Sequence, residues 1–226
     1  MTESETAGLG DPPGRAALPA NSAEDLYWQA AESGHPDPSA YARFALGEQL
    51  ESRGESDAAA DLYREAAESG NAEMSAEARL ALGELLASRG DAAGARSAWQ
   101  AVIDSRSTGW WAESAFINLV NQLFRHNETD GLRAAYYDGA AKGNPEALYA
   151  LGTLRESGGP GVNADPIEAW KWFSLALLAT SNDGKKRAFE AALAGVQKRM
   201  TEPQLDVARE RLKSWLAEHP APAKAR

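Results

Sequence analysis

The chain has 226 residues, with 33 acidic and 23 basic side chains and a formal charge of -10. It contains no cysteine and only three histidines, which excludes disulfides and thiolate zinc sites and leaves little material for a histidine-based catalytic or metal site. The acidic excess argues against a protein that binds duplex nucleic acid, because neutralising phosphates requires a cationic face.

The two ends of the chain have the composition of flexible tails. Residues 1–21 are crowded with glycine and proline and lack the basic start and apolar run of a secretory signal. Residues 219–226, which read HPAPAKAR, are expected to fray in the same way. The longest strongly apolar stretch, residues 173–179, is far shorter than the roughly 20 residues of a membrane helix. We therefore expect a soluble, cytoplasmic protein without a membrane partner.

The region between the tails is predicted to be all helical. It is rich in alanine, leucine, glutamate and arginine, with apolar residues at helical spacing and no sustained strand-like alternation. Three helix starts are marked by local chemistry. Asn144 and Asp165 each precede a proline, and residues 201–204 have the spacing of a capping box.

An internal repeat runs through this helical region. The sequence ALGEQLESRG from Ala45 recurs as ALGELLASRG from Ala81, an offset of 36 residues. A series of aromatic residues continues the period, with small or aliphatic residues four positions before and three after most of them: Tyr27, Tyr63, Trp99, Tyr136 and Phe173. A second series marks a partner helix, whose glycine allows a neighbouring backbone to approach closely: Leu46-Gly47, Leu82-Gly83, Leu119-Val120 and Leu151-Gly152. Two helices per repeat fit this spacing.

This period, with its leucine-glycine, alanine, large aromatic and alanine pattern, resembles the tetratricopeptide repeat superfamily. The stretch over residues 142–176, with a G-N-x-x-A entry, a G-x-G-V-x-x-D loop and an A-x-x-W-F helix, is similar to its Sel-like branch. The resemblance covers residues 22–179 and implies a right-handed superhelical solenoid of antiparallel helix pairs. We expect a helical-repeat domain over residues 22–218, made of an N-terminal half repeat, about four full pairs and a C-terminal capping pair.

Two features invite a chemical interpretation, but packing or connection accounts for them better. Trp110 and Trp111 are neighbours, so on a helix one should pack inward and the other be exposed, and packing is favoured over ligand stacking. The run Gly158-Gly-Pro-Gly161 lacks the Lys-Ser/Thr of a phosphate-binding loop and is interpreted as a lengthened helix connection. The three histidines are scattered, and we find no catalytic constellation. The sequence therefore predicts a non-enzymatic protein with no cofactor and no metal.

The family resemblance indicates where a partner would bind. In tetratricopeptide proteins the first helix of each pair lines the concave groove. Transferred position by position, this predicts the following lining residues: Tyr41, Phe44, Glu48, Glu77, Leu80, Glu84, Ser114, Ile117, Asn121, Phe124, Glu146, Tyr149 and Thr153. Only Asn121 matches the Lys, Arg and Asn pattern of members that capture an acidic C-terminal peptide. The hypothesis is an adaptor or scaffold that binds a protein or peptide with apolar anchors and basic residues.

Two alternatives remain at this point. One is an enzyme-accessory or regulatory protein that acts through the Trp-rich surface around Trp110, and the other is structural assembly through the ends of the superhelix. The chain from residue 183 onward has 10 basic and 6 acidic residues, a net charge of +4, so the remainder carries -14. Head-to-tail association could use this asymmetry, but a solvated cap is favoured, and we expect a monomer or weak homo-oligomer.

Overall fold

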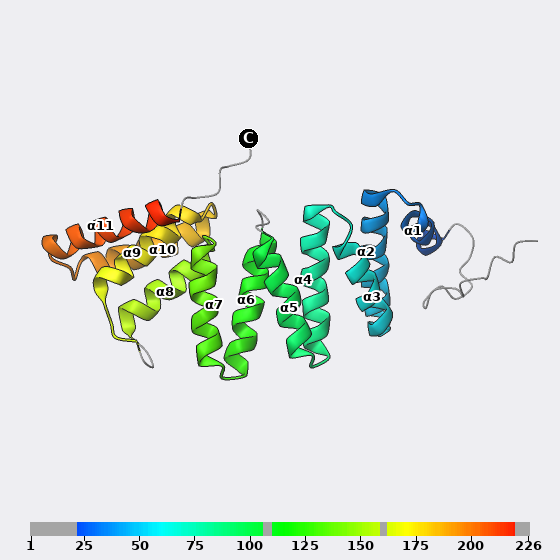
Figure 1. Ribbon diagram of the computed structural model, residues 1–226, viewed down its shortest axis with the longest axis horizontal. Helices are drawn as coiled ribbons and strands as arrows, with labels where there is room; N and C mark the ends of the chain where they lie inside the picture. Colours follow the sequence, from blue (N-terminus) through cyan, green and yellow to red (C-terminus); the bar gives the residue numbers. More distant parts are fainter. Residues whose placement is uncertain (1–21, 106–109, 159–161, 220–226) are drawn as a thin grey trace, which may run out of the picture. The chain divides into compact units, whose positions relative to one another are not determined.

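The computed structural model describes residues 22–105, 110–158 and 162–219. The described residues form eleven α-helices, which confirms the predicted all-α repeat class (Figure 1). Within each part of the molecule the helices pack against their neighbours in chain order, except that α11 packs on α9. The tail predicted over residues 1–21, most of the tail after residue 219, and residues 159–161 of the glycine-rich connection lie outside the described residues. Within the residues that the structure describes, no helix combines the length and the apolar character needed to cross a membrane.

The helices divide into two compact units, residues 1–107 and residues 108–226. Unit 1 contains α1 (Ala23–Glu32), α2 (Pro36–Ser52), α3 (Ser56–Ala67), α4 (Ala72–Ser88) and α5 (Ala92–Asp104). Unit 2 contains α6 (Trp110–Arg125), α7 (Thr129–Ala141), α8 (Pro145–Ser157), α9 (Pro166–Ala179), α10 (Asp183–Gln197) and α11 (Glu202–Glu218). Nothing in the sequence repeat predicts this division.

The three predicted helix starts are confirmed. The Ala147 N–H donates to the Asn144 side chain at 2.9 Å, and the Ile167 N–H donates to Asp165 at 3.0 Å. Thr201 forms the predicted capping box before α11. These bonds satisfy backbone donors that have no partner inside the helix, so each helix begins where its capping residue stands.

Equivalent turns in successive pairs have the same backbone conformation. Gly54 and Gly90 follow the first helix of their pairs with φ values of +83° and +81°, in the left-handed region that glycine adopts without strain. Asn127 stands at the same place in the third pair, with a φ of +57°. Asparagine tolerates this region better than other non-glycine residues, so the turn persists where the glycine is lost.

The two sequence series meet in space. Gly47 in α2 faces the buried ring of Tyr63 in α3 so closely that an added Cβ would lie 2.7 Å from the ring. Gly83 approaches Trp99 in the same way, and Gly152 approaches Phe173. The prediction that these glycines allow close approach is therefore confirmed, and the approach buries three large aromatic rings.

The aromatic series is wrong at its first member. Tyr27 in α1 is 40% exposed, whereas the neighbouring Trp28 is only 4% exposed and belongs to the core. The aromatic of a later pair packs against the glycine of the helix before it. No described helix precedes α1, so Tyr27 has no such cover, and α1 buries the adjacent ring instead. In the third pair, where Val120 replaces the glycine, Tyr136 is only partly buried.

Candidate functional site

The first helix of the first full pair presents an aromatic surface in unit 1. Tyr41 in α2 is 52% exposed, and Phe44 and Glu48 follow it at the spacing of one helix face. The Phe44 ring is partly buried, with its centroid 5.6 Å from that of Tyr63. The Tyr41 ring is therefore accessible to a partner, and the Phe44 ring, on the same helix, is partly accessible.

Carboxylates from two helices converge beside these rings. Glu77 in α4 is partly buried, and burial raises its pKa, with the charges of Glu48 and Glu73 adding to the effect. Glu48 in α2 and Glu77 in α4 are thus close enough to repel one another. Among the residues that the structure describes, no lysine or arginine forms an ion pair with Glu48, Glu73 or Glu77.

The recurring pair Glu48 and Glu84 acts on a shared neighbour. Burial is the main cause that raises the pKa of Tyr63, and its hydroxyl also donates a hydrogen bond to Glu51 at 2.8 Å. The charges of Glu48 and Glu84 raise that pKa further. Glu48, Glu51 and Glu84 therefore all act on one ring of unit 1. We call Tyr41, Phe44, Glu48, Glu77 and Glu84 the acidic face of unit 1.

Leu80 was predicted to line the groove, and the structure corrects this. Its side chain is only 4% exposed and belongs to the core. Leu80 shares its repeat position with the partly buried Phe44, and full burial of a leucine side chain gains about 1.5–3 kcal/mol. The family pattern thus identified the face of the helix without giving the depth of the side chain.

In unit 2, the predicted residues of α6 form an exposed stripe. Ile117, Asn121 and Phe124 are all exposed, and Phe124 is the most open of the three at 75%. Trp110 extends the stripe, standing seven residues before Ile117, and is itself exposed. Trp111 is partly buried, which confirms that the two tryptophans separate into an inner and an outer ring.

The predicted residues of α8 are covered by the chain itself. The Tyr149 ring stacks on the Phe189 ring of α10, with a centroid distance of 4.7 Å and an interplanar angle of 21°. The Nζ of Lys185, also in α10, donates to both Glu113 of α6 and Glu146 of α8. The expectation that Glu146 and Tyr149 line an open groove is therefore corrected, because α10 contacts both of them.

These contacts involve residues that the sequence did not bring forward. Glu113, Lys185 and Phe189 were not among the predicted site residues. A signal was present, because Lys185 and Phe189 are four residues apart on one helix face and lie in the basic C-terminal part of an acidic chain. The repeat pattern hid it, since α10 lacks the leucine-glycine anchor that marks the other pairs.

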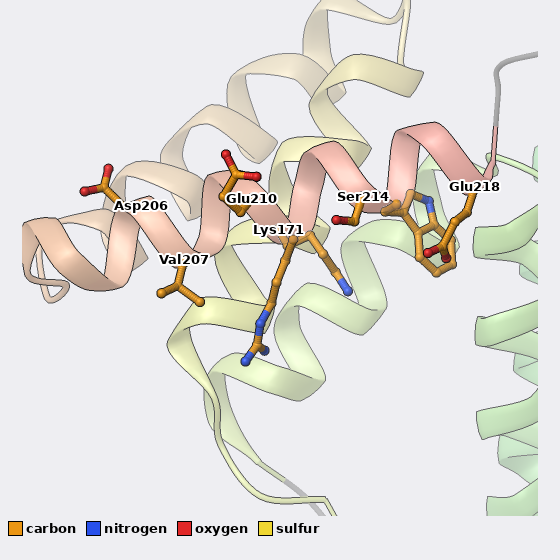
Figure 2. Close-up of a pocket in the computed structure, with 8 residues that line it drawn as sticks. Lys171, Asp206, Val207, Glu210, Ser214 and Glu218 are labelled. Carbon is orange, nitrogen blue, oxygen red and sulfur yellow. The ribbon is translucent and has the colours of Figure 1, made fainter.

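A shallow depression beside α9 and α11 is the other candidate (Figure 2). It has a volume of about 520 Å³ and is lined by Lys171, Asp206, Val207, Glu210, Arg211, Ser214, Trp215 and Glu218. The Lys171 Nζ lies 2.8 Å from Glu168 and 4.1 Å from the ring centroid of Trp172, and Arg211 reaches the same carboxylate at 2.7 Å. Burial would raise the pKa of Glu168, but these two cations lower it. Glu168 thus pairs with both basic groups, Arg211 also lies 3.5 Å from Asp165, and the network joins α11 to α9.

Consecutively packed helix pairs with a 36-residue period define a helical-repeat protein. Among solved structures, the chain is similar to c5321, a protective antigen present in uropathogenic Escherichia coli strains that displays an SLR (Sel1-like repeat) fold. The TM-score is 0.55 at 21% identity, over 87% of this chain and 41% of that one. BtubC from P. vanneervenii aligns with a TM-score of 0.45 at 14% identity, over 90% of this chain and 94% of that one. No protein-family model and no curated protein sequence matches the chain.

The c5321 comparison concerns the fold. The chain spans less than half the length of that protein, and the identity between the two is low. At the level of the fold, the predicted Sel-like helical repeat is confirmed.

Proposed function

We propose that this chain is a non-enzymatic adaptor that binds a segment of a partner protein on the acidic face of unit 1. The observation that carries the proposal is an exposed Tyr41 ring on the same helix as Glu48, together with Glu77 of α4, and no described base neutralises these two carboxylates. Helical-repeat folds generally mediate protein interactions, which supports this class of function without identifying the partner.

The electrostatics favour a basic partner. Glu77 ionises at a cost, because burial and the carboxylates of Glu48 and Glu73 raise its pKa. Such repulsion destabilises the unbound protein slightly, and a lysine or arginine from a partner would relieve it. Groups that weaken the fold yet remain on an exposed face are typical of binding sites.

The apolar component of the face would provide the anchor. A half-exposed tyrosine next to a partly covered phenylalanine is a common composition at the centre of protein interfaces, where aromatic side chains supply much of the binding energy. The partner is thus expected to insert an apolar side chain against Tyr41 and Phe44 and to place its basic groups over the glutamates.

Site-specific photo-crosslinking tests the proposal. A photoreactive phenylalanine analogue replaces Tyr41 in cells that naturally express the chain, and a matched analogue replaces Val207, which is exposed on α11. We expect a discrete crosslinked protein from position 41 that is absent from position 207 and diminished by Glu48→Lys with Glu77→Lys. The same products from both positions, or a yield that ignores the charge reversal, would contradict the proposal.

A second candidate is an accessory or regulatory role through α6, favoured by the exposed stripe of Trp110, Ile117 and Phe124. An analogue at Phe124 discriminates between the two. Crosslinks from Phe124 with none from Tyr41 would transfer the binding function to unit 2.

A further inference from the structure

The helix α10 indicates which ligand chemistry suits a face of this kind. Glu146 in α8 and Glu77 in α4 hold the same repeat position, each standing six residues before the glycine of its leucine-glycine anchor. Tyr149 and Phe44 likewise hold one position, three residues before that glycine. Both groups that α10 contacts on α8 therefore have counterparts of similar chemistry in unit 1.

The two contacts of α10 come from one face of the helix. Lys185 donates to Glu146, and Phe189, four residues later, stacks on Tyr149. Residues four apart on a helix have Cβ atoms about 5–6 Å from each other, one turn along the same face. A base followed by an aromatic residue at this spacing is thus matched to a carboxylate and a ring that also lie one turn apart, at positions 146 and 149.

Unit 1 has receiving groups of the same chemistry without the base, but they stand on two helices, Glu77 on α4 and Phe44 on α2. Glu77 carries the carboxylate, Glu48 and Glu73 add negative charge, and no lysine or arginine in the described part of the chain pairs with any of the three. Phe44 supplies a partly buried ring, and the exposed Tyr41 enlarges the aromatic surface. The charge of this face is complementary to a helix that resembles α10.

We infer that the acidic face of unit 1 binds an amphipathic helix of a separate protein, with a lysine or arginine and an aromatic residue on one face of that helix. The basic group pairs with Glu77 and Glu48, and the aromatic ring packs on Phe44 and Tyr41. This inference rests on the proposed function and specifies the partner segment. It goes beyond a generic groove because it specifies a helical partner and the two kinds of anchor on its contact face.

A peptide with the sequence of residues 182–199 is the probe. It contains Lys185 and Phe189 and is held helical by a lactam between Glu190 and Ala194→Lys, which replaces an exposed residue. Fluorescence anisotropy measures its binding to the intact chain. We expect saturable binding that Glu48→Gln with Glu77→Gln weakens about tenfold, the effect of two ion pairs of moderate strength.

Two sets of controls separate the face from general electrostatics. In the protein, Glu68→Gln with Glu190→Gln makes the same change in charge at exposed positions elsewhere and should leave the affinity unchanged. In the peptide, Lys185→Ala and Phe189→Ala should each weaken binding about fivefold or more.

The results separate this inference from the proposed function. No saturable binding would overturn the inference, as would binding that ignores the glutamines of unit 1 and is instead changed by Glu113→Gln, because the peptide would then exchange with the chain's own α10. A partner crosslinked at position 41 in the same protein would still sustain the adaptor role. Loss of that crosslink removes the proposed function, whatever the peptide does.

Discussion

The ring of Phe189 in α10 stacks on the ring of Tyr149 in α8, with centroids 4.7 Å apart and planes 21° apart. Four residues before Phe189, Lys185 donates hydrogen bonds to the carboxylates of Glu113 and Glu146. In unit 2, α10 therefore covers Glu146 and Tyr149 of α8. In unit 1, the residue at the repeat position of Glu146 in α2 is the exposed Tyr41. The two units should respond differently to substitution of these groups.

Removal of the base in α10 should weaken unit 2. Lys185→Met leaves Glu113 and Glu146, both partly buried, without their shared cation, and we expect a loss of about 1–3 kcal/mol in the free energy of unfolding. Urea denaturation measures it. Lys186→Met is the matched control at an exposed position and should change stability by less than about 0.5 kcal/mol. Equal effects from the two substitutions would show that Lys185 contributes only its charge.

Two glycine substitutions should have opposite signs. Gly152→Ala places a Cβ against the buried ring of Phe173, and overpacking of this kind costs about 1–3 kcal/mol. Gly195→Ala, within α10, meets no atom within 4 Å and should stabilise the helix by up to about 1 kcal/mol. Thermal melts of the two variants check the prediction. A stabilised Gly152→Ala variant would mean that the ring does not hold its observed position.

The buried aromatic series should carry much of the stability of unit 1. Trp99 is almost fully buried, so Trp99→Ala should cost about 3–5 kcal/mol. Tyr27→Ala is the comparison, because Tyr27 belongs to the same sequence series but is largely exposed, and its loss should cost about 1 kcal/mol or less. A calorimetric melt distinguishes the two, and similar losses would contradict the assignment of Trp28 to the core in place of Tyr27.

The pH dependence of stability should show that ionised Glu77 destabilises the folded protein. Its pKa lies above the ordinary value of 4.5, so the folded chain binds more protons than the unfolded chain just above that pH, and ionising Glu77 weakens the fold as pH rises. Glu77→Gln should therefore stabilise the protein at pH 7, by less than about 1 kcal/mol because water screens the group, and have no such effect below about pH 4.5.

Glu168 provides the comparison with the opposite sign. Its pKa is lowered below 4.5, so its ion pairs stabilise the fold above that pH, and their contribution is lost as pH falls. Glu168→Gln should thus destabilise the protein at pH 7. Urea titrations at several pH values measure both variants, and a destabilised Glu77→Gln variant at pH 7 would show that Glu77 has a favourable partner.

The local part of the fold could be predicted from the sequence, because local chemistry decides it. The caps at Asn144 and Asp165 and the approach of Gly47 to Tyr63 depend on residues within one helix pair, and the repeat displays them. The repeat could not show that Tyr27 is exposed, since α1 has the sequence of an internal helix but no described helix precedes it.

The covered part of the candidate site depends on non-local contacts. Lys185 and Glu146 are 39 residues apart, and they meet because α10 packs on α9 and its side chains reach α8. No periodic signal marks such a contact. The depth of Leu80 is likewise decided by how its neighbours pack around it, which the helix pattern does not contain.

The most direct test of the adaptor role uses the partner protein that is crosslinked at position 41. Its dissociation constant is measured for the unaltered chain and for two double variants. Glu48→Lys with Glu77→Lys reverses the acidic face, and Glu68→Lys with Glu190→Lys makes the same change in net charge elsewhere. The adaptor role predicts at least about tenfold weaker binding for the first variant and a change within about twofold for the second. Equal weakening of both variants, or unchanged affinity in the first, would contradict it.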